Sequence, residues 1–385
     1  MQEFYFEHPV KAFFGYGITE KKLKEVLSNY GEKVMLCYGK GSIKRNGVYD
    51  EIKSILAAAG KTVFEFDGIM PNPTYQKAQE GAKFAKEKGV NLVLAVGGGS
   101  VIDCAKIISA QAVNDFDIWD EWFINKNTPT KYLPLISVVT VFGTGAEMNA
   151  GAVITNEEKM KKACIYGAFS DYAFLDVKYS MSAPILQVMS GAFDTLSHCM
   201  EIYFAKPEGN SASDYMNEGA MRCVIDNMRI LSKNPNDLSA RSALAWVSAM
   251  AENGVLKAGK ESAFQAHQIE HQLGAYTDCN HGLGLAAISP SMYLKIYRGG
   301  VEKFKRFAVE VFGVNMQGAD EEIARQGIKE MQKFIKEVGL PTTLREIGIT
   351  DKSCFEKVAK STNIKTGCFT TLKWEDVLDI LNEVY

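Results

Sequence analysis

Short apolar runs alternate with amphipathic helical stretches through the first 180 residues, and this alternation most constrains the possible folds of the chain. Four brief runs are typical of buried strands: KVMLCY (33–38), KTVFEF (61–66), NLVLAV (91–96) and PLISVV (134–139). Between them, residues 47–60 and 74–89 have helical periodicity, and each stretch ends at a glycine that suits a helix C-terminus. This order predicts βαβ units and a doubly wound parallel sheet, which binds ligands at the carboxyl ends of its strands.

The pattern changes near residue 180. After MSAP (181–184) the strand signal largely disappears, and long helical patterns cover residues 185–204, 211–231 and 238–254 as well as much of the chain after Val301. The predicted fold class is therefore α/β. A Rossmann-like parallel-sheet domain is expected over residues 1–180, followed by an all-helical domain over residues 181–385.

Charge and cysteine content argue against several classes of protein. Lys plus Arg total 43 and Asp plus Glu total 46, so the net charge is −3, and nucleic-acid binding is not expected to be the main function. The eight cysteines include no CxxC pair, as expected for a reduced chain without a zinc ribbon. The N-terminus lacks the apolar core of a secretory signal, and no apolar run approaches the ~18 residues of a membrane span. We expect a soluble, cytoplasmic protein.

A glycine-rich segment, GGGSVIDCAK (97–106), directly follows one of the predicted strands. The glycines allow backbone N–H groups to approach a ligand, and the N-terminus of the next helix attracts an anion. Ser100 is expected to cap this helix, with Asp103 at the capping-box position. The segment is a candidate phosphate site, the alternative being an ordinary tight turn. A second segment, 137–149, is either a nucleotide contact or a polar loop. Its small hydrogen-bonding residues are Thr140, Thr144 and Asn149.

Four of the five histidines lie between residues 198 and 281. Asp194 and His198 are four residues apart on one face of a predicted helix, and so are His267 and His271 on another. His281 follows where the chain is expected to leave that second helix. One carboxylate and several imidazoles on facing helices suit a divalent transition metal, and these residue types do not separate zinc from iron.

The stretch HQIEH (267–271) also has the His-x-x-Glu-His spacing of an inverted zincin protease. In such an enzyme both histidines bind the metal and the glutamate is the general base. A metallohydrolase is therefore one hypothesis. The competing hypothesis is that only one of the two histidines binds a metal while the other moves protons.

Several separate segments together resemble the iron-containing (group III) alcohol dehydrogenase family, and within it the butanol dehydrogenase and aldehyde reductase branch. FEHPVKAFFGYG (6–17) is similar to the family's N-terminal hairpin, PNPT (71–74) to a loop beside the nucleotide, and GGGSVIDCAK to the phosphate loop. GAFDTLSHCMEIY (191–203) and HQIEHQLGAYTDCNHGLGLA (267–286) are similar to its two metal-binding segments. The resemblance therefore runs nearly end to end.

The resemblance implies one divalent metal, Fe²⁺ or Zn²⁺, in the cleft between the two domains. The implied metal ligands are Asp194, His198, His267 and His281. His271 matches a histidine beside the nicotinamide and the substrate that is not a ligand, and it is our candidate for relaying the proton. Glu270 is then expected either to support a ligand from behind or to face solvent. A homodimer, joined through the N-terminal hairpin, is also implied.

For the cofactor, the resemblance implies that the phosphate loop holds the pyrophosphate of a nicotinamide dinucleotide. The matching positions are Asn72, Gly97, Gly98, Gly99, Ser100, Asp103, Thr140, Thr144 and Asn149. Lys161 or Lys162 supplies a lysine that reaches the cofactor phosphates, and the sequence leaves this register open.

One departure from some NAD-specific relatives bears on the choice of cofactor. YGKGSIKR (38–45) has Gly39 where those relatives have an aspartate that would repel a 2′-phosphate. Ser42 and three basic residues lie close by in the sequence. Those basic residues are Lys40, Lys44 and Arg45. NADP(H) is therefore favoured over NAD(H).

The implied function is reversible hydride transfer between a small primary alcohol, such as butanol, and its aldehyde. Phe142, Trp246 and Phe264 either accept the alkyl chain or belong to the core. The alternative function is a metal- and NAD-dependent lyase of the dehydroquinate-synthase type. Such a lyase needs Lys and Arg residues beside its metal, and residues 185–285 are poor in them near the histidines.

Overall fold

The computed structural model describes residues 2–207, 209 and 211–385. Residue contacts divide the chain into two compact units. One unit comprises His8–Pro184, and the other comprises Ile185–Tyr385 together with the first residues up to Glu7. The predicted domain boundary at residue 180 lies slightly before this division. No helix of the described residues is long and apolar enough to cross a membrane.

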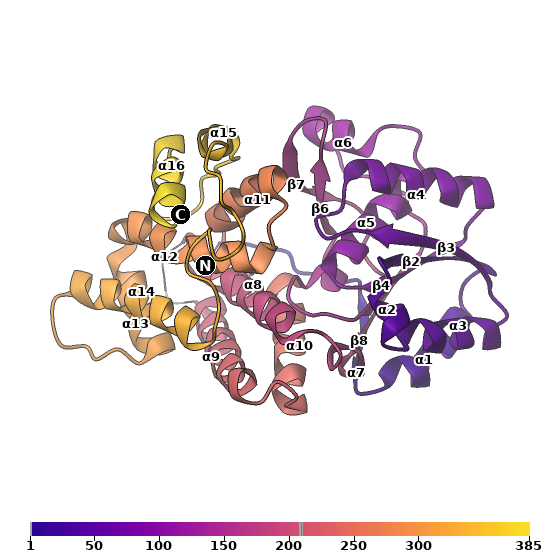
Figure 1. Cartoon of the computed structure of the whole chain (residues 1–385), viewed down its shortest axis with the longest axis horizontal. Helices are drawn as coiled ribbons and strands as arrows, with labels where there is room; N and C mark the ends of the chain where they lie inside the picture. Colours follow the sequence, from indigo (N-terminus) through magenta and orange to yellow (C-terminus); the bar gives the residue numbers. More distant parts are fainter. Residues whose placement is uncertain (1, 208, 210) are drawn as a thin grey trace. The chain divides into compact units, whose positions relative to one another are not determined.

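A six-stranded sheet forms the centre of the unit His8–Pro184 (Figure 1). Its strand order is β1-β8-β5-β4-β2-β3. All neighbouring strands of this sheet are parallel, as predicted. Its strands are β1 (Lys11–Gly15), β2 (Lys33–Gly39), β3 (Thr62–Ile69), β4 (Leu92–Gly97), β5 (Leu135–Val139) and β8 (Tyr172–Asp176). The order changes direction between β2 and β4, because β3 lies on one side of β2 while β4, β5 and β8 follow on the other. Doubly wound sheets bind ligands at the carboxyl ends of their strands, at such a switch point.

Helices cover both faces of this sheet because its central strands are apolar on both sides. In β2, Met35 and Cys37 pack in one core with α4 and α5, whereas Val34, Leu36 and Tyr38 pack in another with α1 and α3. Side chains of a strand alternate between its faces, so one apolar run serves both cores. The helices of this unit are α1 (Ile18–Leu27), α2 (Ser42–Arg45), α3 (Val48–Ala58), α4 (Tyr75–Lys88), α5 (Gly99–Gln111), α6 (Ile118–Asp120), η1 (Glu121–Asn125), η2 (Ala146–Met148) and α7 (Val177–Ser180).

The prediction of an N-terminal hairpin is wrong. Residues 6–17 contain one strand, β1, which pairs in parallel with β8. The hairpin that does form lies later in the chain, where β6 (Gly151–Asn156) and β7 (Lys161–Tyr166) make a separate antiparallel sheet. It packs beside the loop before α4, because Thr155 N–H donates to Pro73 O.

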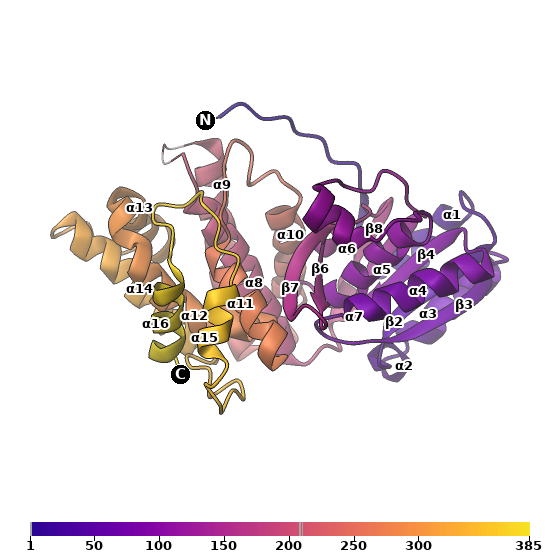
Figure 2. The ribbon, with the colours of Figure 1, turned by 90° about the horizontal axis from the view of Figure 1, so that it is seen from above.

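The unit that begins at Ile185 is built from helices around one large core, and every strand of the described residues ends before Val177. This agrees with the predicted helical second half. Helix α8 lies at its centre and packs against α9, α10, α11 and α12. Helices α13 and α14 pack against each other (Figure 2). The helices are α8 (Ile185–Tyr203), α9 (Ala212–Lys233), α10 (Leu238–Glu252), α11 (Gln265–Thr277), α12 (His281–Ile296), η3 (Tyr297–Gly300), α13 (Val301–Phe312), α14 (Asp320–Glu337), α15 (Phe355–Ser361) and α16 (Trp374–Glu383).

Candidate active site

Helix α8 carries the first two predicted ligands on its buried side. Nearly every residue from Met189 to Tyr203 is buried, which is typical of a helix enclosed by its neighbours. Asp194 and His198 are four residues apart and therefore share a face, and His198 Nε2 lies 3.6 Å from Asp194 Oδ1. Burying a carboxylate and an imidazole costs free energy unless each has a partner, so these two side chains on α8 need partners within the helical unit.

Helix α11 carries His267 close to its N-terminus. The N-cap residue of α11 is Phe264, which has the left-handed backbone angles φ 48° and ψ 47° and provides no side-chain cap. The cap comes instead from Glu201 on α8, whose carboxylate accepts from the N–H groups of Ala266 at 2.7 Å and His267 at 3.3 Å. The ring of Phe264 lies against the rings of His198 and His267, with centroid distances of 6.1 and 5.3 Å. This contact fixes the start of α11 beside the ligands of α8.

His281 is the first residue of helix α12, so the expectation that it lies where the chain leaves α11 is wrong. Helix α11 ends at Thr277, and the side chain of Asn280 caps α12 by accepting from Leu283 N–H. Asn280 Oδ1 also accepts from Ser190 Oγ on α8 at 2.6 Å. The start of α12 therefore lies against α8 one helical turn before Asp194.

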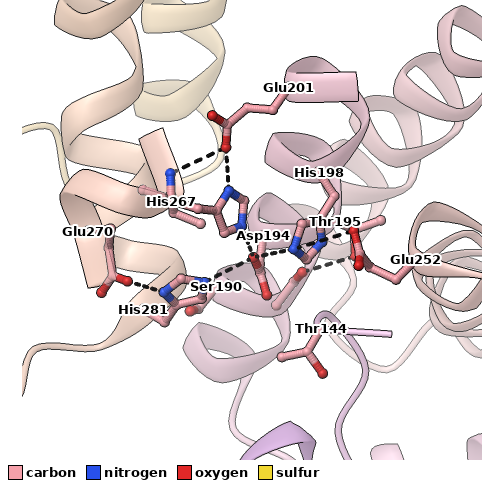
Figure 3. Close-up of polar contacts among 12 residues, drawn as sticks. Thr144, Ser190, Asp194, Thr195, His198, Glu201, Glu252, His267, Glu270 and His281 are labelled. Carbon is pink, nitrogen blue, oxygen red and sulfur yellow. Dashed lines mark hydrogen bonds and ion pairs between the residues drawn. The ribbon is translucent and has the colours of Figure 1, made fainter. Parts of the chain in front are cut away.

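Three of the four predicted ligands converge on one oxygen atom of the fourth, Asp194. Asp194 Oδ1 lies 3.2 Å from His267 Nε2, 3.4 Å from His281 Nε2 and 3.6 Å from His198 Nε2 (Figure 3). Three imidazole nitrogens and a carboxylate oxygen that face one another in a buried site are the donor set of a divalent transition metal. The residues present therefore fit one Fe²⁺ or Zn²⁺ ion.

The charges of this cluster influence one another strongly. Burial disfavours the ionised form of Asp194, but the charges of His198 and His281 hold its pKa well below the usual value. Burial also disfavours protonated His267, but the Glu201 charge and hydrogen bonds to Asp194 and Glu201 raise its pKa to about 10. For His198 burial dominates and lowers the pKa. The acidic surroundings therefore favour a cation among these side chains.

His271 lies one turn further along α11, beside the ligands. Its ring centroid is 5.3 Å from that of His281 and 5.9 Å from that of His267, and the residue is buried. Glu270 is fully buried and accepts from His281 Nδ1–H, so of its two expected positions the structure shows the one behind a predicted ligand and not the one facing solvent. The residue that the sequence did not reveal is Glu201, which contacts His267 Nδ1.

The predicted wall residues differ in their positions. Trp246 on α10 is 41% exposed. Phe142 packs at the edge of the core that α4 and α5 share with the sheet. Among the described residues, Phe264 alone of the three has its ring against those of the predicted ligands.

In the unit His8–Pro184, the predicted cofactor residues gather at the carboxyl ends of neighbouring strands. Gly39 ends β2, Asn72 follows β3, Gly97 ends β4 and Thr140 follows β5. These strands are adjacent in the sheet order β5-β4-β2-β3, which includes the switch point. These predicted cofactor segments therefore meet at the edge where such sheets bind nucleotides.

The glycine-rich loop, the predicted phosphate site, is tighter than the sequence suggested. Helix α5 begins at Gly99 with Gly98 as the preceding cap residue, so the prediction that Ser100 caps it is wrong. Asp103 forms no capping box, because its Oδ2 accepts from Val153 N–H on β6. A Cβ on Gly99 would lie 2.6 Å from Thr144 Cγ2, so glycine permits a close contact between the two predicted cofactor segments.

The two lysines of β7 point to different surroundings because side chains alternate along a strand. Lys162 is buried, and its Nζ donates to Asn72 Oδ1 at 2.8 Å. Lys161 points elsewhere, with its ammonium 4.4 Å from the ring centroid of Phe123. The structure therefore brings Lys162, and not Lys161, to another predicted cofactor residue.

A buried charged group lies behind the phosphate loop. Lys106 on α5 is fully buried, and its ammonium donates to Asn149 Oδ1 at 3.0 Å and to Gly151 O at 2.6 Å. Asp103 Oδ1 lies 4.0 Å from the same ammonium.

Glu147 is also buried. Burial and, to a lesser degree, the Asp103 charge raise its pKa to about 7, against the influence of Lys106.

Glu147 is expected to make stability depend on pH. An unfolded glutamate has a pKa of 4.5, and the folded value is about 7. The folded protein therefore binds this proton more tightly than the unfolded chain does. The free energy of unfolding falls as the pH rises from about 4.5 through 7. The full effect is roughly 3 kcal/mol. Melting temperatures of the parent and Glu147→Gln should diverge above pH 5, the variant losing less stability by pH 8. Parallel curves would contradict this assignment.

A doubly wound sheet with a glycine loop and a helical unit that gathers one carboxylate and three imidazoles are typical of a metal-dependent dehydrogenase. The family model described as iron-containing alcohol dehydrogenase matches residues 9–177. The model described as Fe-containing alcohol dehydrogenase family, C-terminal, matches residues 188–385. The chain belongs to the iron-containing alcohol dehydrogenase family, and the prediction of an oxidoreductase of this family is confirmed.

Individual relatives are similar over most or all of their length. The chain is 36% identical over 395 residues to NADH-dependent butanol dehydrogenase A of Clostridium acetobutylicum, with 100% of both chains covered. It is 30% identical to NADPH-dependent aldehyde reductase YqhD of Escherichia coli, over 92% of this chain and 91% of that protein. The crystal structure of NADH-dependent butanol dehydrogenase A from Thermotoga maritima has a TM-score of 0.94 at 36% identity and covers 100% of this chain and 99% of its own.

Proposed function

We propose that this chain catalyses reversible hydride transfer between a small primary alcohol, such as butanol, and its aldehyde, with a nicotinamide dinucleotide as the second substrate. The observation that carries the proposal is the convergence of three imidazole Nε2 atoms on Asp194 Oδ1 in a chain that belongs to this family. The relatives named as butanol dehydrogenase and aldehyde reductase support this pair of substrates.

In this proposal the ligands Asp194, His198, His267 and His281 hold one divalent ion, Fe²⁺ or Zn²⁺. When bound, the ion supplies Lewis acidity toward the oxygen of the alcohol or aldehyde. His271 is the proposed proton relay, because a neutral imidazole accepts a proton and an imidazolium returns it near neutral pH. Its position beside His281 and its burial allow it to act next to the proposed ligands. Phe264 is the proposed apolar wall beside the ligands.

The nucleotide is proposed to bind across the carboxyl ends of β2, β3, β4 and β5. Backbone N–H groups at the start of α5 and the side chain of Lys162 would hold the pyrophosphate, since both offer positive electrostatic potential. The proposed contacts are Gly39, Ser42, Asn72, Gly97, Gly98, Gly99, Ser100, Asp103, Thr140, Thr144, Asn149 and Lys162. Asp103 and Asn149 would act by fixing the loops, since their side chains already bond to Val153 and Lys106.

NADP(H) is proposed as the preferred cofactor, because Gly39 brings no carboxylate to the end of β2 and Ser42 and Lys44 follow on exposed positions. Gly39→Asp should lower the NADPH to NADH ratio of kcat/KM by at least about tenfold, since one added like charge costs a 2′-phosphate about 1.4 kcal/mol or more. Gly39→Asn has nearly the same shape and is the matched control. An equal fall in both variants would show a steric effect near Ile69 O, which a new Cβ would approach to 3.2 Å.

The lyase alternative is not favoured by the surroundings of the ligands. A phosphorylated substrate needs basic groups nearby, yet the charged contacts described around the ligand imidazoles are carboxylates: Glu201, Glu252 and Glu270. The match of both family models to the chain likewise disfavours the metallohydrolase hypothesis. A homodimer and a cytoplasmic location stay predictions, and light scattering during gel filtration would test the first.

The function is tested by oxidation of NADPH or NADH at 340 nm with butyraldehyde. The assay is run on the protein as purified, after chelation, and after return of Fe²⁺ or Zn²⁺. We expect activity that chelation abolishes and one of the two metals restores, with the higher kcat/KM for NADPH. Protein that contains metal yet oxidises neither nucleotide would contradict the proposal.

A further inference from the structure

Two buried carboxylates lie behind two of the ligand imidazoles (Figure 3). His267 Nδ1–H donates to Glu201 Oε2, and His281 Nδ1–H donates to Glu270 Oε2. Glu201 is 6% exposed and Glu270 is 0% exposed. The other nitrogen of each ring, Nε2, faces Asp194 Oδ1. Each ring is therefore held between a carboxylate at its back and the proposed metal position at its front.

This arrangement selects one tautomer for each ring. A carboxylate accepts hydrogen bonds and donates none when ionised, so the Nδ1 atom beside it carries the proton. The lone pair of a neutral ring is then on Nε2, the atom that faces Asp194. A carboxylate behind an imidazole also increases the basicity of the ligating nitrogen.

The third imidazole provides an internal contrast. Among the described residues, His198 Nδ1 is buried and has no hydrogen-bond partner. The carboxylate near this residue, Glu252, lies 3.9 Å from Nε2 and so on the side that faces Asp194. The three ligand histidines are therefore not equivalent, because only two are oriented by a carboxylate from behind.

Both carboxylates are themselves held by other parts of the helical unit. Glu201 accepts from the N–H groups of Ala266 and His267, so it also caps α11. Glu270 Oε1 accepts from Cys279 Sγ–H at 3.7 Å, and a Cβ on Gly284 would lie 2.9 Å from Glu270 Cγ. Neither carboxylate can move away without loss of these contacts, so both are pre-organised for their imidazoles.

We propose that Glu201 and Glu270 are positioning residues that set the affinity of this site for a divalent cation, through His267 and His281 respectively. This inference rests on the proposed function only in that the four ligands bind one metal ion. The two carboxylates add two negative charges to that of Asp194 and leave Nε2 as the unprotonated nitrogen of each neutral ring. Their loss leaves the four ligands in place but weakens two of them.

The test uses metal-free full-length protein titrated with Co²⁺, followed by its visible absorption, and with Zn²⁺ in competition with a chromogenic chelator. Glu201→Gln and Glu270→Gln should each weaken metal binding by about 10- to 100-fold. The Co²⁺ spectrum should change in both variants, while elemental analysis gives one ion per chain in the parent. Glu201→Asp keeps the charge on a shorter side chain, so its affinity for the metal should lie between those of Glu201→Gln and the parent. If Glu201→Gln does not fold, the affinity of Glu201→Asp is compared with that of the parent instead.

Glu218→Gln is the matched control. Glu218 is a buried carboxylate of α9 that accepts from Tyr203 and Arg306 and is bonded to none of the ligands. Its variant should be less stable yet bind Co²⁺ within about twofold of the parent, because its partners are not in the metal site. Unchanged affinity in both Glu201→Gln and Glu270→Gln would overturn the inference while leaving the proposed function intact.

Two other outcomes separate the inference from its premise. Glu270, His271 and His281 offer ligand atoms within 4.8 Å of one another. If the parent binds two ions and Glu270→Gln loses one, Glu270 is a ligand of a second ion, and the positioning role is overturned. If the parent binds no divalent metal at all, the proposed function fails together with the inference.

Discussion

The His267→Ala variant should purify without metal and have the activity of the chelated enzyme. It removes one of the three Nε2 atoms that face Asp194 Oδ1, and it also leaves Glu201 without its imidazole partner. His271→Ala should keep its metal and instead lose turnover by about 10²- to 10⁴-fold, the range of a general acid or base. Elemental analysis of both purified variants, together with kcat and its pH profile, separates the two roles.

Gln268→Ala is the control, because it truncates a residue of the same helix that is assigned to neither role. It should keep both metal and activity. Loss of metal from both histidine variants would contradict the division of labour and would make His271 a ligand. Full activity in His271→Ala would show that another group relays the proton.

The Gly99→Ala variant should weaken the binding of NADPH by about 10- to 100-fold while its metal content is unchanged. The added methyl group would lie 2.6 Å from Thr144 Cγ2, and an overlap of this kind typically costs about 1–3 kcal/mol. The start of α5 or the 140–149 loop must therefore move, and both are proposed to contact the nucleotide. Fluorescence titration with NADPH measures the change.

The partner of this contact provides a further test. The Thr144→Ala change removes the overlapping Cγ2. The double variant Gly99→Ala with Thr144→Ala should therefore bind NADPH more tightly than Gly99→Ala alone, and the difference measures the coupling between the two positions. Gly219→Ala is the matched control, since a Cβ there meets no atom within 4 Å. It should leave NADPH binding unchanged. Equal affinities for the parent and Gly99→Ala would exclude the loop from the nucleotide site.

The strands that could be predicted from sequence were those with brief apolar runs bounded by Gly, Pro or Asn. β2, β3, β4 and β5 are such runs, and all four lie side by side in the sheet. β7 begins with two lysines and gave no comparable signal, and β1 and β8 were not recognised although they are no shorter than β5. Their positions depend on pairing with distant parts of the chain, which periodicity does not report.

The same distinction holds for the candidate site. Asp194 with His198 and His267 with His271 were found because each pair has the spacing of one helical face. Glu201 was missed although it lies three residues after His198, because its role depends on how α8 packs against α11. Ser100 was wrongly expected to cap α5 because the helix already begins at Gly99, with Gly98 as the cap residue.

Phe264 illustrates how a local cost is kept where it serves the site. A phenylalanine with a φ of 48° is strained by about 1 kcal/mol or more, and glycine or asparagine would adopt this conformation more easily. Neither of them could place an aromatic ring against His198 and His267. Selection for thermal stability alone would therefore favour replacements at residue 264 that leave space beside the ligands, and heat-resistant variants found in this way should be checked for a weakened preference among alcohols.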